Sequence, residues 1–254
     1  MINIVKIGGN VVDSPDALAR FIADFAAMPG QKILVHGGGR EATRIAGRLG
    51  VETQMIDGRR VTSREMLDVA TMVYAGLVNK RVVAMLQAAG CNAIGLSGAD
   101  AGVIRACRRS PEPTDYGYVG DIAEVDAGFI ATLLGAGIVP VFCAITHDGN
   151  GSLLNCNADS VASTVAVASA KIAPARLIYC FEMPGVMADI ANPDSLIEEI
   201  RPLDYAMLRA SGIISKGMIP KIDNAFASIE AGVESVVIKH ASALNSPLGT
   251  TIRR

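Results

Sequence analysis

Apolar runs of strand length alternate with amphipathic segments of helix length along most of this 254-residue chain. The expected strands are rich in Val, Ile and Leu, as in strands buried on both faces: Ile2–Ile7, Lys32–His36, Ile138–Ile145, Leu177–Phe181 and Val233–Lys239. Parallel strands need long crossover connections, usually helices, so this alternation favours a parallel sheet. We therefore predict an α/β fold, a three-layer αβα sandwich with a mainly parallel central sheet in which Ile138–Ile145 is a central strand.

Local signals place helices between these strands. Ser14 followed by Pro15 is typical of a helix start. The apolar residues that follow share one helical face: Leu18, Phe21, Ile22 and Phe25. Thr62-Ser63-Arg64-Glu65 matches a capping box and predicts a long helix that runs to about Ala88.

The chain length suits one large α/β domain or two lobes that share a sheet. A helix that begins after its expected N-cap, Asn157, ends near Pro174. No repeat or Pro/Ser-rich linker interrupts the sequence, so this break is the best boundary. We predict an N-terminal lobe of residues 1–172 and a C-terminal lobe of residues 173–254.

Composition excludes several classes of protein. The chain has 23 basic and 25 acidic residues, a net charge of −2, which argues against a polybasic nucleic-acid binder. A mean hydropathy of +0.37 with only 19% charged residues excludes disorder. Five scattered cysteines without a CxxC pair predict reduced core thiols, not disulfides or a zinc site. No unbroken apolar stretch approaches the roughly 18 residues of a membrane helix, and no signal peptide is visible, so we predict a cytoplasmic protein.

Glycine clusters follow expected strands at Gly8-Gly9, Gly37–Gly39 and Ser97-Gly98. Glycine lets backbone N–H groups approach an anion closely, and ligands of parallel sheets bind at the carboxyl ends of strands. Lys6 lies inside an apolar strand just before the first cluster, and burying an unpaired ammonium group is costly. The first two clusters together therefore predict a phosphate-binding site in two parts.

The P-loop pattern GxxxxGK[ST] is absent. Gly37-x-Gly39-x-x-Ala42 matches the dinucleotide fingerprint formally, with Asp57 near the position of a ribose-binding acid. This match follows the second strand instead of the first, so a nicotinamide-dependent oxidoreductase is an alternative of low weight.

Five motifs occur in the order typical of one family: Lys6–Gly9, His36–Gly39, Gly58–Thr62, Asn155–Asp159 and Gly212–Lys221. Through them the chain resembles the N-acetylglutamate kinases of the amino-acid kinase superfamily over essentially its whole length. The resemblance implies an open αβα sandwich with N-acyl-glutamate in the N-terminal lobe and ATP, with Mg²⁺, in the C-terminal lobe. It also implies phosphorylation of the side-chain carboxylate, the second step of arginine biosynthesis.

The resemblance assigns roles residue by residue. The catalytic residues it implies are Lys6, Lys221 and Asp159, the two lysines stabilising the transition state and Asp159 holding their ammonium groups. The substrate-binding residues it implies are Gly38, Gly39, Arg60 and Asn155. The phosphate- and ATP-binding residues it implies are Gly8, Gly9, Glu182, Gly185, Val186, Met187, Ile213 and Ser215. It assigns no protein side chain as a direct metal ligand.

These residue types suit such a reaction. A glutamate side-chain carboxylate, with a pKa of about 4.3, is already ionised at neutral pH and needs no general base. The transfer needs positioning and neutralisation of phosphoryl charge, which lysines supply, and a carboxylate of the substrate suits the bidentate donor Arg60. His36, at a strand end beside glycines, is expected to hydrogen-bond the loop and not to react.

The sequence also departs from the family pattern. Glu182 stands where Asp is usual, Lys216 replaces a small or acidic residue, and Ala99 stands where Lys is frequent. The residues around the N-acyl group are not recognisable, so acetyl is the first expectation and a larger acyl chain stays open.

Two further alternatives stay open: another carboxylate or carbamate kinase of the superfamily, and a non-catalytic small-molecule sensor. Arg60 and Asn155 favour an acyl-glutamate substrate, and the retained lysines argue against a sensor. Related arginine-inhibited hexamers carry an extra helix before the first strand, whereas this chain starts at Ile2. We therefore predict a homodimer insensitive to arginine, and the charge and apolar pattern of the chain predict no nucleic-acid or membrane partner.

Overall fold

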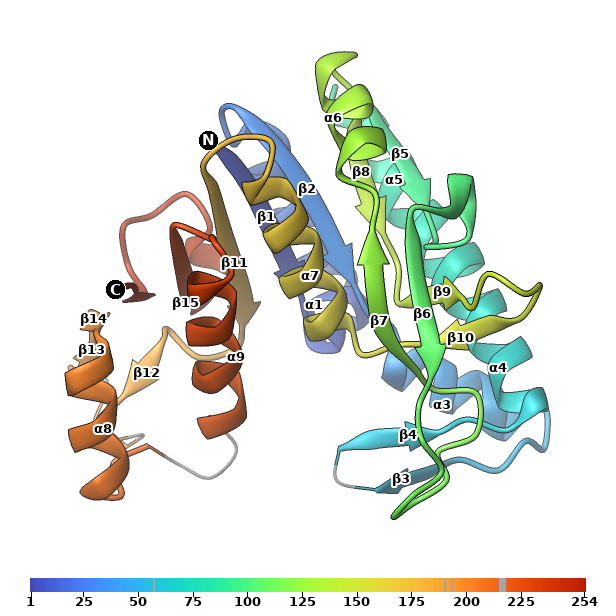
Figure 1. The fold of residues 1–254 in the computed structure, drawn as a ribbon. Helices are drawn as coiled ribbons and strands as arrows, with labels where there is room; N and C mark the ends of the chain where they lie inside the picture. The colour runs from blue at the N-terminus through green and yellow to red at the C-terminus, as the bar shows by residue number, and fades with distance from the viewer. Residues whose placement is uncertain (57, 190, 193, 215–217) are drawn as a thin grey trace.

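An eight-stranded sheet forms the centre of the protein, for which a computed structural model describes residues 1–56, 58–189, 191–192, 194–214 and 218–254. Its strands, in spatial order, are β14 (Glu199–Ile200), β16 (Thr250–Ile252), β15 (Ser235–His240), β11 (Ala175–Phe181), β1 (Ile2–Ile7), β2 (Gln31–His36), β8 (Val139–Phe142) and β5 (Ala93–Leu96). Neighbouring strands are parallel except for the antiparallel pair β15–β16. This arrangement confirms the predicted mainly parallel sheet (Figure 1).

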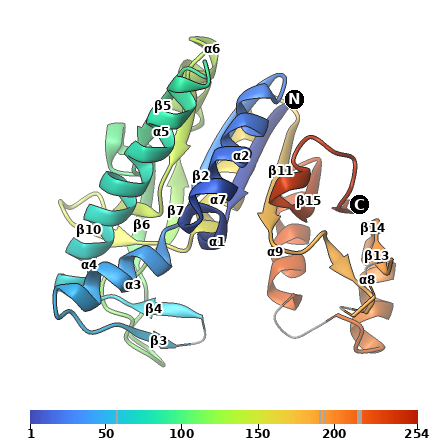
Figure 2. The same ribbon diagram turned by 180° about the vertical axis from the view of Figure 1, so that it is seen from behind.

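Helices cover both faces of the sheet and complete the three layers. One face carries α6 (Ala127–Gly135), α7 (Ala158–Ala170) and α9 (Ile219–Glu230), with α8 (Pro202–Ala210) beside α9. The opposite face, seen in Figure 2, carries α2 (Pro15–Ala27) and α5 (Asn79–Ala88). Along β1, Ile2 and Ile4 join the core beneath α7, whereas Val5 and Ile7 join the core beneath α2. Because side chains alternate along a strand, Lys6 projects toward α7.

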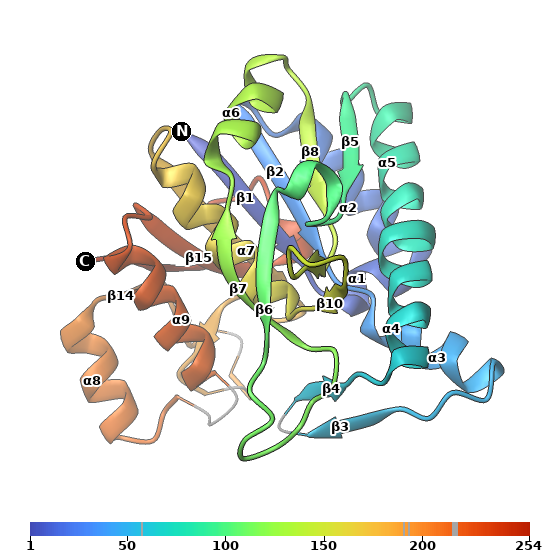
Figure 3. The same cartoon turned by 45° about the vertical axis from the view of Figure 1, so that its right-hand side comes forward.

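A smaller mixed sheet stands beside the large one (Figure 3). In spatial order it comprises β10 (Leu153–Asn155), β9 (Ile145–His147), β6 (Ile104–Arg108) and β7 (Gly120–Val125). Two short antiparallel ribbons complete the strands: β3 (Gln54–Ile56) with β4 (Arg59–Val61), and β12 (Val186–Met187) with β13 (Leu196–Ile197). The remaining short elements are α1 (Gly9–Asp13), α3 (Gly39–Arg48), η2 (Asp100–Gly102) and η3 (Ala241–Ala243).

The prediction of one central strand over Ile138–Ile145 was wrong. The chain leaves the large sheet after Phe142 and enters the smaller sheet at Ile145, so β8 and β9 are separate strands. β8 lies between β2 and β5, one position from the sheet edge. The whole segment is apolar because both strands are buried, so the apolar pattern carries no mark of the break between them.

The predicted long helix is confirmed, but its cap is different. Ser63, not Thr62, is the N-cap, and its Oγ accepts a hydrogen bond from the N–H of Met66 at 3.1 Å. Thr62 is buried and forms an isolated bridge with Gly117. The helix itself runs through α4 (Arg64–Thr71), a π-helical turn η1 (Met72–Val78) and α5.

This helix corrects another expectation. By length and composition alone the run Arg64–Ala88 could cross a membrane, with a mean hydropathy of 1.3 over 18 residues. The sequence contains no unbroken apolar stretch of that length, and the expectation of no membrane-length helix considered only unbroken stretches. In the fold, Met66, Val73, Val82 and Leu86 of the run are buried in the core that includes α2. The run therefore packs as a core helix. Core helices can have the same length and composition as membrane-spanning helices.

His36, at the end of β2, is completely buried. Its Nδ1 lies 2.7 Å from the carbonyl oxygen of Gly37 and therefore donates to it. Its Nε2 lies 3.0 Å from Nδ2 of Asn79, which also donates to the carbonyl of Val141 at 2.9 Å. Burial lowers the pKa of His36 to about 4, with the charge of Lys80 acting in the same direction. The ring is thus a neutral structural link below the glycine turn, as expected from the sequence.

The neutral state of His36 predicts that the protein loses stability in acid. The free energy of unfolding should fall as the pH drops from 6.5 toward 4, because the unfolded chain binds a proton that the folded protein excludes. A pKa that moves from 6.5 to about 4 corresponds to a loss of ~3 kcal/mol. Urea unfolding across this pH range, compared between the wild type and His36→Gln, measures the effect; equal pH dependence in both proteins would contradict it.

Candidate functional site

Two ammonium groups from opposite ends of the chain meet over one aromatic ring. Lys6 lies near the end of β1 and Lys221 in the first turn of α9. Their Nζ atoms lie 5.5 Å and 3.5 Å, respectively, from the centre of the Phe181 ring, at the end of β11. The sequence predicted that the two lysines converge, and the fold brings them together.

Asp159 supplies the negative charge at this point. Its Oδ1 lies 2.6 Å from Nζ of Lys6, and the side chains are only 10% exposed for Lys6 and 26% for Asp159. Asp159 is in the first turn of α7, where a negative charge is favoured. Asn157 caps this helix, as predicted, because its Oδ1 accepts the N–H groups of Asp159 and Ser160 at 2.7 Å and 3.3 Å.

The electrostatics of Lys221 follow from this grouping. Burial lowers the pKa of Lys221, and the nearby charge of Lys6 lowers it further. The carboxylates of Asp159 and Glu182 oppose both effects. The ammonium groups of Lys6 and Lys221 thus lie close together beside the same carboxylates. A bound polyanion would reduce the repulsion between them.

The aromatic ring that carries the lysines was not identified from the sequence. Phe181 stacks on Tyr179, with ring centres 5.9 Å apart and planes 16° apart. The Tyr179 hydroxyl in turn donates to the backbone carbonyl of Asp159 at 3.3 Å. Cation–π contacts hold both ammonium groups without neutralising them.

A cavity of about 190 Å³ lies beside the Lys6–Asp159 pair. It is lined by residues 37–39, 58–60 and 155–158, together with Met55, Tyr74, Val119 and Ala144. Ala158 of the cavity directly precedes Asp159. All four predicted substrate-binding residues, Gly38, Gly39, Arg60 and Asn155, therefore lie together in one cavity next to the lysines.

Arg60 is buried in the wall of this cavity with part of its hydrogen-bonding capacity unused. Its Nη2 donates to the carbonyl of Gly39 at 2.9 Å and to Oγ1 of Thr43 at 2.8 Å. Its Nη1 is buried and has no hydrogen-bond partner among the described residues. A buried guanidinium held on one side and unpaired on the other is suited to a carboxylate ligand.

Asn155 is held by Thr62, which the sequence predicted to be a helix cap. Its Nδ2 donates to Oγ1 of Thr62 at 3.0 Å, and Thr62 donates to the carbonyl of Arg60 at 3.1 Å. The Oδ1 of Asn155 is the amide atom left to accept from a ligand. Thr62 thus connects the side chain of Asn155 to the backbone of Arg60, a role for which the sequence carried no signal.

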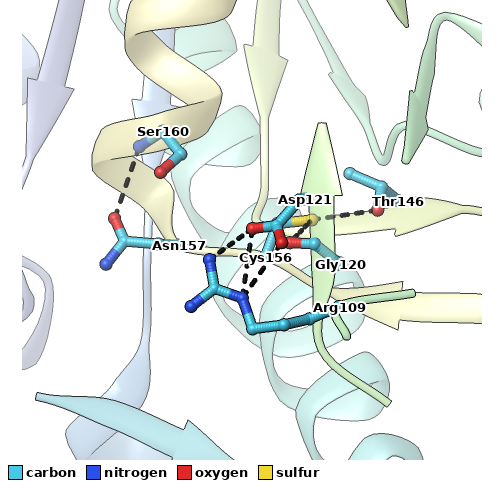
Figure 4. A network of polar contacts seen from close by, with 7 residues as sticks. All are labelled: Arg109, Gly120, Asp121, Thr146, Cys156, Asn157 and Ser160. Atoms are coloured by element: carbon cyan, nitrogen blue, oxygen red, sulfur yellow. Dashed lines mark hydrogen bonds and ion pairs between the residues drawn. The ribbon is translucent and has the colours of Figure 1, made fainter. Parts of the chain in front are cut away.

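Cys156 lines the cavity, and Figure 4 shows the polar contacts of its side chain. The thiol donates to the carbonyl of Gly120 at 3.2 Å and lies 3.2 Å from Oγ1 of Thr146. Burial raises the pKa of Cys156 to about 11, so it is a neutral thiol at physiological pH and a poor nucleophile or metal ligand. All five cysteines are free, as predicted, although Cys107 is exposed and does not belong to the core.

The Arg109–Asp121 ion pair lies next to Cys156 in the same view. Nε of Arg109 donates to Oδ2 of Asp121 at 3.0 Å. This pair joins the loop after β6 to the start of β7, close to Val119 of the cavity.

The two glycine turns lie at the carboxyl ends of β1 and β2, as predicted. Gly8 is the N-cap of α1 and Gly38 the N-cap of α3, so both turns present backbone N–H groups. Gly9 and Gly39 begin the two helices. This placement suits the predicted binding of anionic groups between the turns and the lysines.

The predicted nucleotide-binding residues are more dispersed. Glu182 lines a second cavity of about 300 Å³ together with Phe181, next to the lysines. Val186 and Met187 are buried in β12, whereas Ile213 is 40% exposed. Gly185 lies against β13, since a Cβ there would be 2.6 Å from Cδ1 of Leu196.

Three further positions named in the sequence analysis, Asp57, Ser215 and Lys216, lie outside the described residues. Among the residues that are described, no cluster of three or more His, Cys, Asp or Glu side chains is arranged to hold a metal ion.

Comparison with known proteins identifies the family of this chain. The profile of the amino acid kinase family matches residues 1–240, and the chain belongs to this family. The acetylglutamate kinase of Phocaeicola vulgatus is 52% identical over 253 residues, covering 100% of this chain and 98% of that protein. The acetylglutamate kinase of Methanopyrus kandleri is 42% identical, covering 98% and 99%. The resemblance to the N-acetylglutamate kinases is thereby confirmed.

A solved structure supports the fold independently. The smu.665 protein of Streptococcus mutans is 29% identical, with a TM-score of 0.78 over 99% of this chain and 98% of that one. The αβα sandwich with a mainly parallel sheet is therefore shared with a protein of known structure.

Proposed function

We propose that this protein transfers the γ-phosphoryl group of ATP to the side-chain carboxylate of an N-acyl-L-glutamate, with N-acetyl-L-glutamate as the expected substrate. The product is an acyl phosphate, and the reaction is the second step of arginine biosynthesis. The enzyme is a kinase, in agreement with the full-length acetylglutamate kinase relatives. The observation that carries the proposal is the convergence of Lys6 and Lys221 on Phe181, next to the cavity that contains Arg60.

The substrate would be oriented by groups left unpaired in the cavity. Nη1 of Arg60 faces the α-carboxylate, and Oδ1 of Asn155 accepts the N–H of the acyl amide. The extended side chain then directs its terminal carboxylate toward Lys6 and Asp159. Unacylated glutamate would place an ammonium group near Arg60 and offer Asn155 no amide.

The transfer step needs no protein base. An oxygen of the ionised substrate carboxylate attacks the γ-phosphorus, a new O–P bond forms, and the bond to the β-phosphate oxygen breaks to leave ADP. Lys6 and Lys221 neutralise the charge on the transferring group, and the N–H groups around Gly8, Gly9 and Gly38 contribute to its binding. His36, neutral and hydrogen-bonded on both ring nitrogens, takes no part.

The donor set fits Mg²⁺ that is bound mainly through ATP. Mg²⁺ commonly binds through substrate phosphates and only one or two carboxylates. Asp159 and Glu182, the acidic groups around Lys221, are the side chains that would lie near it. The metal would neutralise phosphate charge.

We assign acyl-glutamate binding to residues 1–172 and ATP binding to residues 173–254. In this assignment Glu182, Gly185, Val186, Met187 and Ile213 surround the nucleotide, and Ser215 belongs to the same set although it lies outside the described residues. The exposure of Glu182 and Ile213 fits direct contact. The burial of Val186 and Met187 supports contact through their backbone only.

We also propose that the protein acts as a homodimer in the cytoplasm and is insensitive to arginine. Apolar side chains remain exposed on the long helix, with Met72 55% and Leu77 41% exposed, and would be covered by a second copy. Light scattering should give twice the chain mass; a hexamer, or inhibition by millimolar arginine, would contradict this part of the proposal.

A coupled ADP-release assay across N-acetyl-L-glutamate, N-succinyl-L-glutamate, L-glutamate and carbamate tests the activity and the acyl preference together. We expect turnover of an N-acyl-glutamate, dependence on Mg²⁺ that EDTA removes, and trapping of the acyl phosphate by hydroxylamine as a hydroxamate. ATP binding without ADP release from any of these substrates would favour the sensor, and turnover of carbamate alone would favour a carbamate kinase.

Variants connect this activity to the site. Lys6→Met and Lys221→Met should each lower kcat by about 100-fold or more, because the lost charge acts in the transition state. KM for the acyl-glutamate should change little. Lys171→Met removes an exposed lysine at the far end of α7 and should leave both parameters unchanged. Unchanged kcat in either active-site variant would contradict the assignment.

A further inference from the structure

A π-helical turn lies directly beneath the glycine turn of the cavity. Residues Met72–Val78 form this turn within an otherwise α-helical run. Such turns are rare and frequently occur at functional sites. Here it brings Tyr74 beneath Gly38, and Asn79, the first residue after it, beside His36.

The ring of Tyr74 supports the glycine turn. A Cβ atom built on Gly38 would lie 2.9 Å from Cδ1 and 3.2 Å from Cε1 of Tyr74. These distances leave no room for a side chain, so the ring and the Gly38 backbone are in direct contact. The ring therefore determines where the turn lies in the cavity.

The hydroxyl of Tyr74 and the guanidinium of Arg60 both lie near Gly39 in the cavity. A Cβ atom built on Gly39 would lie 3.9 Å from Oη of Tyr74 and 3.8 Å from Nη2 of Arg60. Burial raises the pKa of Tyr74, while the nearby charge of Arg60 opposes that rise. The phenol thus stays protonated at physiological pH.

The direction of hydrogen bonding follows from chemistry. A guanidinium can only donate, so Arg60 cannot take the proton of the Tyr74 hydroxyl, and that proton is available to another acceptor. Both residues line the cavity, and Nη1 of Arg60 is buried without a described partner. A carboxylate placed there would accept from both groups.

We propose that Tyr74 is a substrate-positioning residue whose hydroxyl donates a hydrogen bond to the α-carboxylate bound by Arg60. The inference rests on the proposed function and adds a specificity contact to it. A purely structural role for Tyr74 would reside in its ring, whereas the proposed role resides in its hydroxyl. The two roles are therefore separable by a single oxygen atom.

The variant Tyr74→Phe removes that oxygen and keeps the ring against Gly38. Calorimetry without ATP should show Kd for N-acetyl-L-glutamate rising about tenfold, as expected for one hydrogen bond to a charged group. KM should rise in parallel, with kcat, KM for ATP and Tm essentially unchanged. The matched control is Tyr205→Phe, which removes a hydroxyl bonded to Asp223 at 2.6 Å on α9 and should leave Kd unchanged.

A ligand without the α-carboxylate identifies the contact. 4-Acetamidobutanoate has the acyl amide and the terminal carboxylate of the substrate but lacks the α-carboxylate. Its Kd should be equal for the wild type and Tyr74→Phe. An equal penalty for both ligands would assign Tyr74 to the shape of the cavity and overturn the inference, as would no penalty for either. Failure of the wild type to bind N-acetyl-L-glutamate would instead overturn the proposed function.

Discussion

The ion pair between Lys6 and Asp159 is the interaction on which the site depends. An ammonium group inside an apolar strand is costly to bury unless a negative charge meets it. At 2.6 Å the carboxylate of Asp159 meets that requirement and joins β1 to the first turn of α7. The cap at Asn157 and the hydroxyl of Tyr179 fix the backbone around Asp159.

The remaining charges are arranged around this pair. Phe181 holds Lys221 against the same region without cancelling its charge, so two cations share one carboxylate. Such an excess of positive charge in a partly buried place suits the negative charge that must be neutralised during a phosphoryl transfer. In the proposed function, Gly38, supported by Tyr74, and Arg60 set the distance between this point and the far end of the substrate.

The sequence predicted the layers, most elements and the grouping of Lys6, Lys221, Asp159, Arg60 and Asn155. Strand runs and caps are local signals, and the resemblance to the N-acetylglutamate kinases supplied the grouping of the five site residues. The sequence missed contacts that depend on the path of the chain in space. Only the tertiary structure shows that Ile138–Ile145 is divided between two sheets and that Thr62 holds Asn155 in the cavity. It also shows the positions of Phe181 and Tyr74, which resemble ordinary core residues in the sequence.

A crystal structure with ADP, aluminium fluoride, Mg²⁺ and N-acetyl-L-glutamate tests the central claim most directly, because the planar fluoride mimics the phosphoryl group in transfer. We expect Nζ of Lys6 and Nζ of Lys221 each within about 3 Å of a fluoride or a bridging oxygen, with Asp159 still beside Lys6. If either ammonium group points away from the fluoride, charge neutralisation by the two lysines is not how this protein works.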